Sequence, residues 1–242
     1  MAREVDEDYK RLTDFLDDYN LTALLNEPPY RLSLKQGHAA YLALLTLWSA
    51  IQFNCAQRPI PVLDKTLTED DHSFRFIQEA ISDVGSSFFC CLHGAYKPGN
   101  MALRSAIENF VRSMTGLFNA TALTATSVYE LFDLAKTSRP FLATDGKIAI
   151  ERLQKSYKEL CKYTHSATLA HMAGIQSLDH FPTLDKDTFS DWAQEVKATT
   201  SSIISSFAAS ATGFYQSCHF RTKDILEPYI SREQRLRLLG GA

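Results

Sequence analysis

The chain has 242 residues, of which 45% are hydrophobic and 22% are charged, and its formal net charge is −3. These values are typical of a packed globular protein and exclude a largely disordered one. They also lack the overall basic excess that marks many nucleic-acid-binding proteins. Five cysteines without a CxxC pair, and an acidic N-terminus in place of a basic and apolar leader, predict reduced thiols and a cytoplasmic protein.

Apolar residues recur at intervals of three and four along most of the chain, and no clean two-residue alternation bounded by hairpin turns is visible. We therefore predict an all-α fold, a single-domain helical bundle of about seven to eight helices over residues 1–242. The helices are expected at residues 5–19, 36–57, 69–93, 99–119, 127–138, 146–166, 187–222 and 231–238. Residues 239–242 are expected to form a flexible tail.

Helix-breaking and helix-capping residues support these boundaries. Pro28-Pro29 and the segment from Pro59 to Pro61 predict loops, because proline lacks an amide hydrogen and clashes with the preceding turn. Thr68 and Ser127 each precede a periodic run with an acidic residue in its first turn, which is typical of a helix N-terminus.

Two of the predicted helices contain long charge-free stretches, residues 36–57 and 198–220. Each is long enough to cross a bilayer, which takes about 20 apolar residues, but the second holds nine Ser or Thr residues. We interpret both as central core helices, with membrane insertion as the less favoured alternative. Small residues at four-residue intervals in the second stretch predict a close helix crossing, either within the fold or across a dimer interface. These residues are Ser201, Ser205, Ala209, Gly213 and Ser217.

The helix predicted over 99–119 carries Arg104, Glu108 and Arg112 at intervals of four, opposite its apolar face. One interpretation is a solvated face, on which each pair contributes about 0.2 to 0.5 kcal/mol. The neighbouring polar positions are small and neutral, however, which indicates that another helix, a second subunit or a ligand packs close. Those positions are Ser105, Asn109, Ser113 and Gly116.

The helix predicted over 146–166 carries the densest positive charge in the chain, with five bases and two acids between Lys147 and Lys162. Lys158 and Lys162 lie on its outer side, where they either contact phosphates or are simply solvated. His165 continues that edge at the helix end. Because histidine exchanges a proton near neutral pH, His165 is a candidate general acid or base, with a structural cap as the alternative. His171 is a second candidate.

Other chemistry is not indicated by the sequence. Neither a paired metal-ligand spacing nor a glycine-rich phosphate loop nor a nucleophile elbow occurs. We therefore expect no metal and no cofactor.

Two stretches, Arg104-Ser-Ala-Ile-Glu108 and Leu160-Cys-Lys-Tyr-Thr-His165, resemble those of HEPN-like bacterial helical proteins. In that family a helix bearing Arg-x-x-x-Glu is followed by a helix that ends in a Tyr-x-His-like stretch. The resemblance covers roughly residues 85–170. It implies an α-helical core at about residues 85–222, with N-terminal helices over 5–57 packed on it. It also implies dimers, and relatives that are metal-independent ribonucleases of toxin, abortive-infection and antiviral defence systems.

The ribonucleases of that family carry an arginine followed by a histidine with four to six residues between them. Here the positions that would hold that arginine before His165 are Lys158, Glu159 and Leu160. Lysine lacks the planar fork with which arginine grips a phosphate. The one literal match in the chain is Arg31 with His38, in the segment that leads into the first charge-free helix.

Three functional hypotheses follow. The first is an effector that cleaves or binds RNA. In this hypothesis His165 is the general acid or base, Arg104 and Arg112 steady phosphate charge, and Glu108 orients one arginine. Lys158 and Lys162 then grip the strand.

The second hypothesis is a non-catalytic interaction or sensor module that binds a partner protein or a nucleotide and in which Arg104, Glu108 and His165 form a structural network. The third is a membrane-acting effector using residues 198–220. Expected partners are a second copy of the chain or another protein of the same system, and RNA; a membrane is the least expected partner.

Overall fold

The computed structural model describes residues 3–18, 25–165, 168, 172 and 183–240. Over these residues the protein is all-α, as predicted, with eleven α-helices, one two-stranded hairpin and short 3-10 turns that include η2 (Arg139–Phe141) and η5 (Glu227–Tyr229). The helices are α1 (Arg3–Asp18), α2 (Pro28–Cys55), α3 (His72–Leu92), α4 (Tyr96–Gly116), α5 (Thr121–Thr124), α6 (Val128–Thr137), α7 (Thr144–Thr164), α8 (Lys186–Ser210), α9 (Thr212–Ser217), α10 (Phe220–Leu226) and α11 (Arg232–Leu238).

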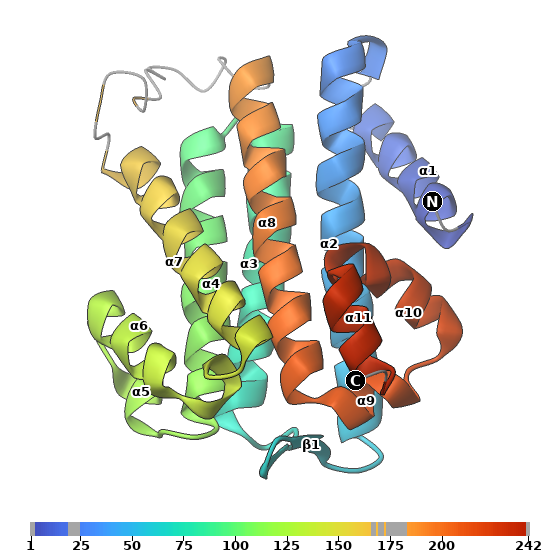
Figure 1. Ribbon diagram of the computed structural model, residues 1–242. Coiled ribbons are helices and arrows are strands. Elements are labelled where there is room, and N and C mark those ends of the chain that lie inside the picture. The colour runs from blue at the N-terminus through green and yellow to red at the C-terminus, as the bar shows by residue number, and fades with distance from the viewer. Residues whose placement is uncertain (1–2, 19–24, 166–167, 169–171, 173–182, 241–242) are drawn as a thin grey trace.

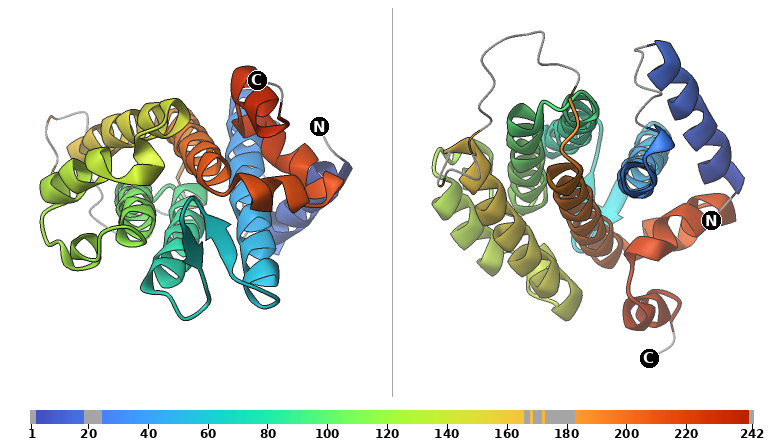
Figure 2. Two further views of the ribbon diagram at one scale, coloured as in Figure 1. Left: turned by 60° about the horizontal axis from the view of Figure 1, so that its bottom comes forward. Right: turned by 90° about the horizontal axis from the view of Figure 1, so that it is seen from above.

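Helices α3, α4, α7 and α8 pack side by side with alternating direction, and α2 packs against α8 (Figure 1). Seen from above, α1 lies on the outer side of α2, and α7 lies on the other side of the bundle (Figure 2). One continuous apolar core joins the helices. Each large side chain buried there stabilises the fold by roughly 1.5 to 3 kcal/mol. The largest fully buried side chains include Trp192, Phe110, Phe132, Phe189 and Phe207.

Helix α2 begins earlier than the sequence suggested. The loop predicted at Pro28-Pro29 is wrong, because both prolines occupy the first turn of α2. The first amides of a helix have no acceptor within the helix, so a residue without an N–H is tolerated there and its fixed φ favours the helix.

The loop predicted between Pro59 and Pro61 is also wrong, because part of it is a strand. Strand β1 (Ile60–Val62) pairs antiparallel with β2 (Lys65–Leu67), and Pro61 lies opposite Thr66. A two-stranded ribbon leaves one edge of each strand open, and a missing amide hydrogen costs little at an open edge. The two-residue turn between the strands places Leu63 at a φ of +54°.

The start of α3 also differs, whereas the start of α6 agrees. The carboxylate of Asp71 accepts hydrogen bonds from the Thr68 amide (2.6 Å) and hydroxyl (2.8 Å), which holds residues 68–71 in a turn and delays α3 to His72. The cap predicted at Ser127 is confirmed, since its hydroxyl accepts a hydrogen bond from the Glu130 amide at 3.4 Å.

The single long helix predicted over 187–222 is divided into α8, α9 and α10. The Leu63 amide of the hairpin donates to the Ser210 carbonyl at 2.8 Å. That carbonyl would accept a hydrogen bond from the Phe214 amide if α8 continued. The backbone leaves the helical region at Ala211, with φ −121° and ψ 52°.

The two charge-free stretches lie mainly in α2 and α8, which pack against each other. The stripe of small residues on α8 receives α11 of the same chain. Gln234, 1% exposed, accepts from the Ser205 hydroxyl (2.5 Å) and donates to the Ser205 carbonyl (2.7 Å). The crossing within the fold is therefore present at Ser205. Among the helices of the described chain, none combines the length and the apolar character that crossing a bilayer requires.

Candidate functional site

Helix α4 is enclosed by its neighbours, which explains its small polar side chains. The Ser113 hydroxyl donates to the Ser73 carbonyl at 2.8 Å, and the Asn109 amide donates to the Asp83 carboxylate at 2.8 Å, so both hold α3. Gly116 packs directly against α5, where a Cβ would have no room. The close neighbour that the sequence indicated is therefore another helix of the same chain.

Arg104 and Glu108 lie where α4 meets α7. The Arg104 Nε is 3.8 Å from the Glu108 Oε1, and the two side chains are 24% and 22% exposed. The guanidinium carbon lies 5.5 Å from the centroid of the Tyr157 ring, and Nη1 lies 3.9 Å from the Cys161 Sγ. One cation therefore contacts a carboxylate, an aromatic face and a thiol at the same helix junction.

The electrostatics of this junction favour a neutral phenol beside a charged pair. Burial raises the pKa of Tyr157, and a hydrogen bond to Glu108 together with the Glu108 charge raises it further, against the opposing effect of Arg104. The phenol therefore stays protonated beside the carboxylate. The Arg104 Nε is buried without a hydrogen-bond partner, because its distance to Glu108 is that of an ion pair and too long for a hydrogen bond.

Arg112, one turn further along α4, is bound to backbone. Its Nη1 donates to the carbonyls of Ala122 (2.8 Å) and Ala125 (2.9 Å), at the end of α5 and in the loop that follows it. Its guanidinium carbon lies 5.6 Å from the centroid of the Phe76 ring. These contacts direct the side chain toward the protein and fix the loop between α5 and α6.

The outward face of α7 carries what we call the basic ridge, made of Lys147, Lys155, Lys158, Lys162 and His165. All five side chains are exposed. At 100° per residue they fall within about 80° of the helix circumference. Lys162 pairs with Glu159, whereas the other three lysines have no ion-pair partner among the described residues.

His165 ends this ridge as the C-cap of α7, and its amide donates to the Cys161 carbonyl at 3.1 Å. Its exposed ring lies one turn beyond the thiol that touches Arg104. Within the described part of the chain, neither Arg104 nor Glu108 forms a hydrogen bond or ion pair with His165.

The six residues predicted for the site thus fall into two groups. Three make interhelical or backbone contacts (Arg104, Glu108 and Arg112), and three lie on the surface (Lys158, Lys162 and His165). His171 lies outside the described residues.

Sequence reasoning missed Tyr157 and Cys161 as the partners of Arg104, although their four-residue spacing matches that of Arg104 and Glu108. It also missed a pair formed by Asp8 and His38, whose ring Nε2 and carboxylate oxygen are 3.0 Å apart. Thirty positions separate these two residues in the sequence, and no local pattern joins them. Over the described residues, no three His, Cys, Asp or Glu side chains are grouped so as to hold a metal ion.

No protein-family model matches the chain, and no curated protein or solved structure matches it either.

Proposed function

We propose that this protein binds RNA along the basic ridge of α7, as a cytoplasmic, HEPN-like helical effector. The observation that carries the proposal is the row of three exposed lysines without an ion-pair partner among the described residues, namely Lys147, Lys155 and Lys158. The ridge runs about 27 Å from Lys147 to His165, at about 1.5 Å per residue. Cations in a row along one helix suit a chain of phosphates, because binding releases the counterions condensed on the nucleic acid. Two acids lie among them, Glu159, which pairs with Lys162, and the exposed Glu151 between Lys147 and Lys155.

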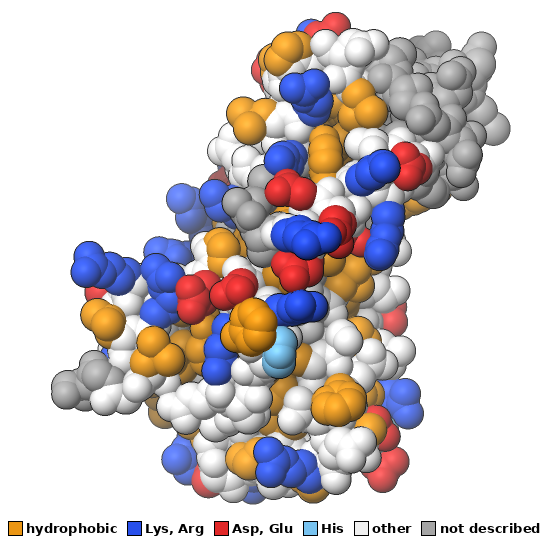
Figure 3. All heavy atoms as spheres, turned by 90° about the vertical axis from the view of Figure 1, so that its right-hand side faces the viewer, with side chains coloured by type: hydrophobic (Ala, Val, Ile, Leu, Met, Phe, Trp, Pro, Cys, Tyr) orange, Lys and Arg blue, Asp and Glu red, His pale blue; other side chains and the backbone are white. Residues whose placement is uncertain are grey.

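A merely solvated surface would distribute its charges differently. Elsewhere on the described surface cations commonly pair with acids, as Lys186 does with Glu27 (2.6 Å) and Arg139 with Asp64 (2.7 Å). The face that carries α1 and α10 shows acidic and basic side chains interspersed (Figure 3). Single exposed lysines without an ion-pair partner also occur elsewhere on the described surface, as at Lys65 and Lys197, whereas α7 carries three on one side of one helix.

Arg104 and Glu108 do not belong to the basic ridge, but they hold α7 in the orientation that exposes it. Their contacts with Tyr157 and Cys161 fix the rotation of α7 against α4. That rotation decides which α7 side chains face outward, so these two are positioning residues in this proposal.

The test is binding of a fluorescein-labelled single-stranded RNA, measured by anisotropy at several salt concentrations. The double variant Lys155→Glu/Lys158→Glu should bind at least tenfold more weakly and with a shallower salt dependence, because phosphate contacts are lost. A matched control, Lys65→Glu/Lys197→Glu, makes the same charge change at exposed lysines of β2 and α8. If the two double variants lose affinity equally, only net charge matters and the ridge is not the binding surface.

Cleavage of the bound RNA is a second candidate activity, favoured by the place of His165. It is the only member of the basic ridge that can take or give a proton near neutral pH, and it is exposed at the end where a strand would leave the ridge. Wild-type protein should then cut single-stranded RNA or tRNA in the absence of metal. His165→Ala should bind the RNA with unchanged affinity and leave it intact. Wild-type protein that binds RNA without cutting it would be a non-catalytic binding module.

A further inference from the structure

A cavity of about 310 Å³ lies between α1, α2 and α3, on the side of the molecule away from α7. Leucines of all three helices line it, together with the rings of Tyr41, Phe88 and Phe89. Its polar groups are gathered at one end, where Asp8, Arg11 and His38 meet. Pockets for small molecules typically measure about 300 to 1,000 Å³ and combine apolar walls with a few polar groups, so this cavity is at the lower end of that range.

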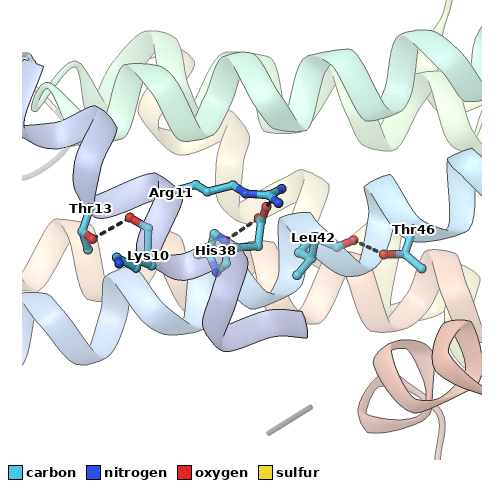
Figure 4. Close-up of polar contacts among 7 residues, drawn as sticks. Lys10, Arg11, Thr13, His38, Leu42 and Thr46 are labelled. Atoms are coloured by element: carbon cyan, nitrogen blue, oxygen red, sulfur yellow. Dashed lines mark hydrogen bonds and ion pairs between the residues drawn. The ribbon is translucent and has the colours of Figure 1, made fainter. Parts of the chain in front are cut away.

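The polar end is organised around the carboxylate of Asp8, which contacts both His38 and Arg11. Figure 4 shows that Arg11 of α1 and His38 of α2 lie close together there. The ring Nε2 of His38 is 3.0 Å from the Asp8 Oδ2, and the two side chains are 4% and 34% exposed. An ionised carboxylate only accepts hydrogen bonds, so Nε2 carries the proton of this bond. Arg11 is 82% exposed and lies 3.5 Å from the Asp8 Oδ1, which makes it a loose partner.

The charge of the Asp8 carboxylate is not cancelled by His38. Burial, together with the charge of Lys35, lowers the pKa of His38 against the opposing effects of the hydrogen bond and charge of Asp8. The ring is therefore neutral at pH 7, with its lone pair on Nδ1. That nitrogen is buried and without a hydrogen-bond partner. Because a molecule in the cavity cannot reach Nδ1, His38 cannot take a proton from that molecule. The polar end of the cavity is therefore suited to binding and not to proton transfer.

We infer that this cavity binds a small organic amine, with its apolar body against the aromatic walls and its ammonium group on the Asp8 carboxylate. The carboxylate is held in place before the ligand arrives, which lowers the ordering cost of binding. The three aromatic rings favour an apolar or aromatic body on the ligand, and the carboxylate favours the ammonium group over a neutral one. An anionic ligand would meet the fixed negative charge of Asp8, and its only counterpart would be the exposed Arg11.

The test uses 2-phenylethylamine as the probe and isothermal titration calorimetry on the full chain. We expect the amine to bind at least tenfold more tightly than 2-phenylethanol, and 3-phenylpropanoate to show no binding. Asp8→Asn should weaken amine binding at least tenfold. Asp14→Asn makes the same change at an exposed residue of α1 outside the cavity lining, and it should bind as the wild type does. Equal binding of the amine and the alcohol, or tighter binding of the carboxylate, would overturn the inference.

A second variant keeps the test decisive if Asp8→Asn loosens α1. Leu45→Trp enlarges a residue of the cavity lining that is 37% exposed. It leaves the bond between Asp8 and His38 untouched, so it should block the amine while the circular dichroism spectrum stays unchanged. Amine binding that survives in both variants would place the binding site elsewhere and refute the assignment of this cavity.

Discussion

The two edges of α7 use charge in opposite ways. On the edge that meets α4, Arg104 contacts Glu108, Tyr157 and Cys161 and is 24% exposed. On the outward edge, lysines such as Lys158 are exposed and have no ion-pair partner within the described residues. A charged residue close to a candidate site can therefore hold two helices together without binding a ligand. Substitutions of the charges between α4 and α7 should change the free energy of unfolding, and substitutions of the outward lysines should change the affinity for RNA.

The largest expected effect is that of Arg112→Ala. This change removes two hydrogen bonds and leaves the carbonyls of Ala122 and Ala125, residues that are 0% and 8% exposed, without a donor. Since hydrogen bonds to charged groups contribute about 1.5 to 3 kcal/mol each, the free energy of unfolding should fall by about 3 kcal/mol. Urea denaturation followed by circular dichroism measures this. The control Arg152→Ala, at an exposed residue of α7, should change it by less than about 0.5 kcal/mol.

Arg104→Ala should lower the free energy of unfolding by about 2 kcal/mol, because it leaves the partly buried Glu108 without its cation and removes the contact with the Tyr157 ring. Arg104→Lys should recover only part of this loss, since lysine lacks the planar group that stacks on a ring. RNA affinity of the folded variant should stay within about twofold of wild type. A variant that keeps wild-type stability but loses RNA binding would show that Arg104 acts in RNA binding, as Lys158 is proposed to do, and not in the packing of α4 on α7.

Tyr157→Phe should lower the free energy of unfolding by about 1 kcal/mol near neutral pH, because the partly buried Glu108 carboxylate loses the neutral hydroxyl beside it. The effect should depend on pH in a defined direction. Because the pKa of Tyr157 is raised in the folded state, the unfolded chain ionises first and the wild type loses stability as pH rises above about 10. The stability difference between wild type and Tyr157→Phe should therefore shrink above that pH. A difference that grows there would contradict the raised pKa.

The smallest effect on stability is expected for Lys158→Ala, below about 0.5 kcal/mol, because the side chain is exposed and has no ion-pair partner among the described residues. RNA affinity should nevertheless fall at every RNA sequence tested, and the salt dependence should lose about one phosphate contact. Parallel urea and anisotropy titrations would separate the two quantities. A loss of stability without a loss of affinity would remove Lys158 from the proposed binding surface.

The main helices were predictable because each buries an apolar stripe of helical period, a property local to the sequence. The helix boundaries that were predicted wrongly depend on contacts with distant parts of the chain or on side chains that bond to nearby backbone. The end of α8 is set by the Leu63 amide, and the delayed start of α3 is set by the Asp71 carboxylate on Thr68. Periodicity contains neither interaction.

The candidate site was predictable only in part. The small neutral residues beside Arg104 and Glu108 correctly indicated a close neighbour on that side of α4. Which charges turn inward could not be predicted, because this depends on the rotation of α7 against α4. The cavity at Asp8 and His38 was invisible because its residues come from three helices, each with an ordinary pattern of its own.

The bond from the Leu63 amide to the Ser210 carbonyl has a consequence for the order of folding. It joins residues 147 positions apart (210 minus 63), and contacts of such separation form late because the intervening chain must first be closed into a loop. Most of α8 can form as soon as it packs on α7, the helix that precedes it in the chain, whereas its last turn has no defined end until the hairpin arrives. Substitutions around residue 210 should therefore speed unfolding and leave the folding rate nearly unchanged. The contact between the hairpin and the end of α8 then forms last, on a bundle that is already assembled.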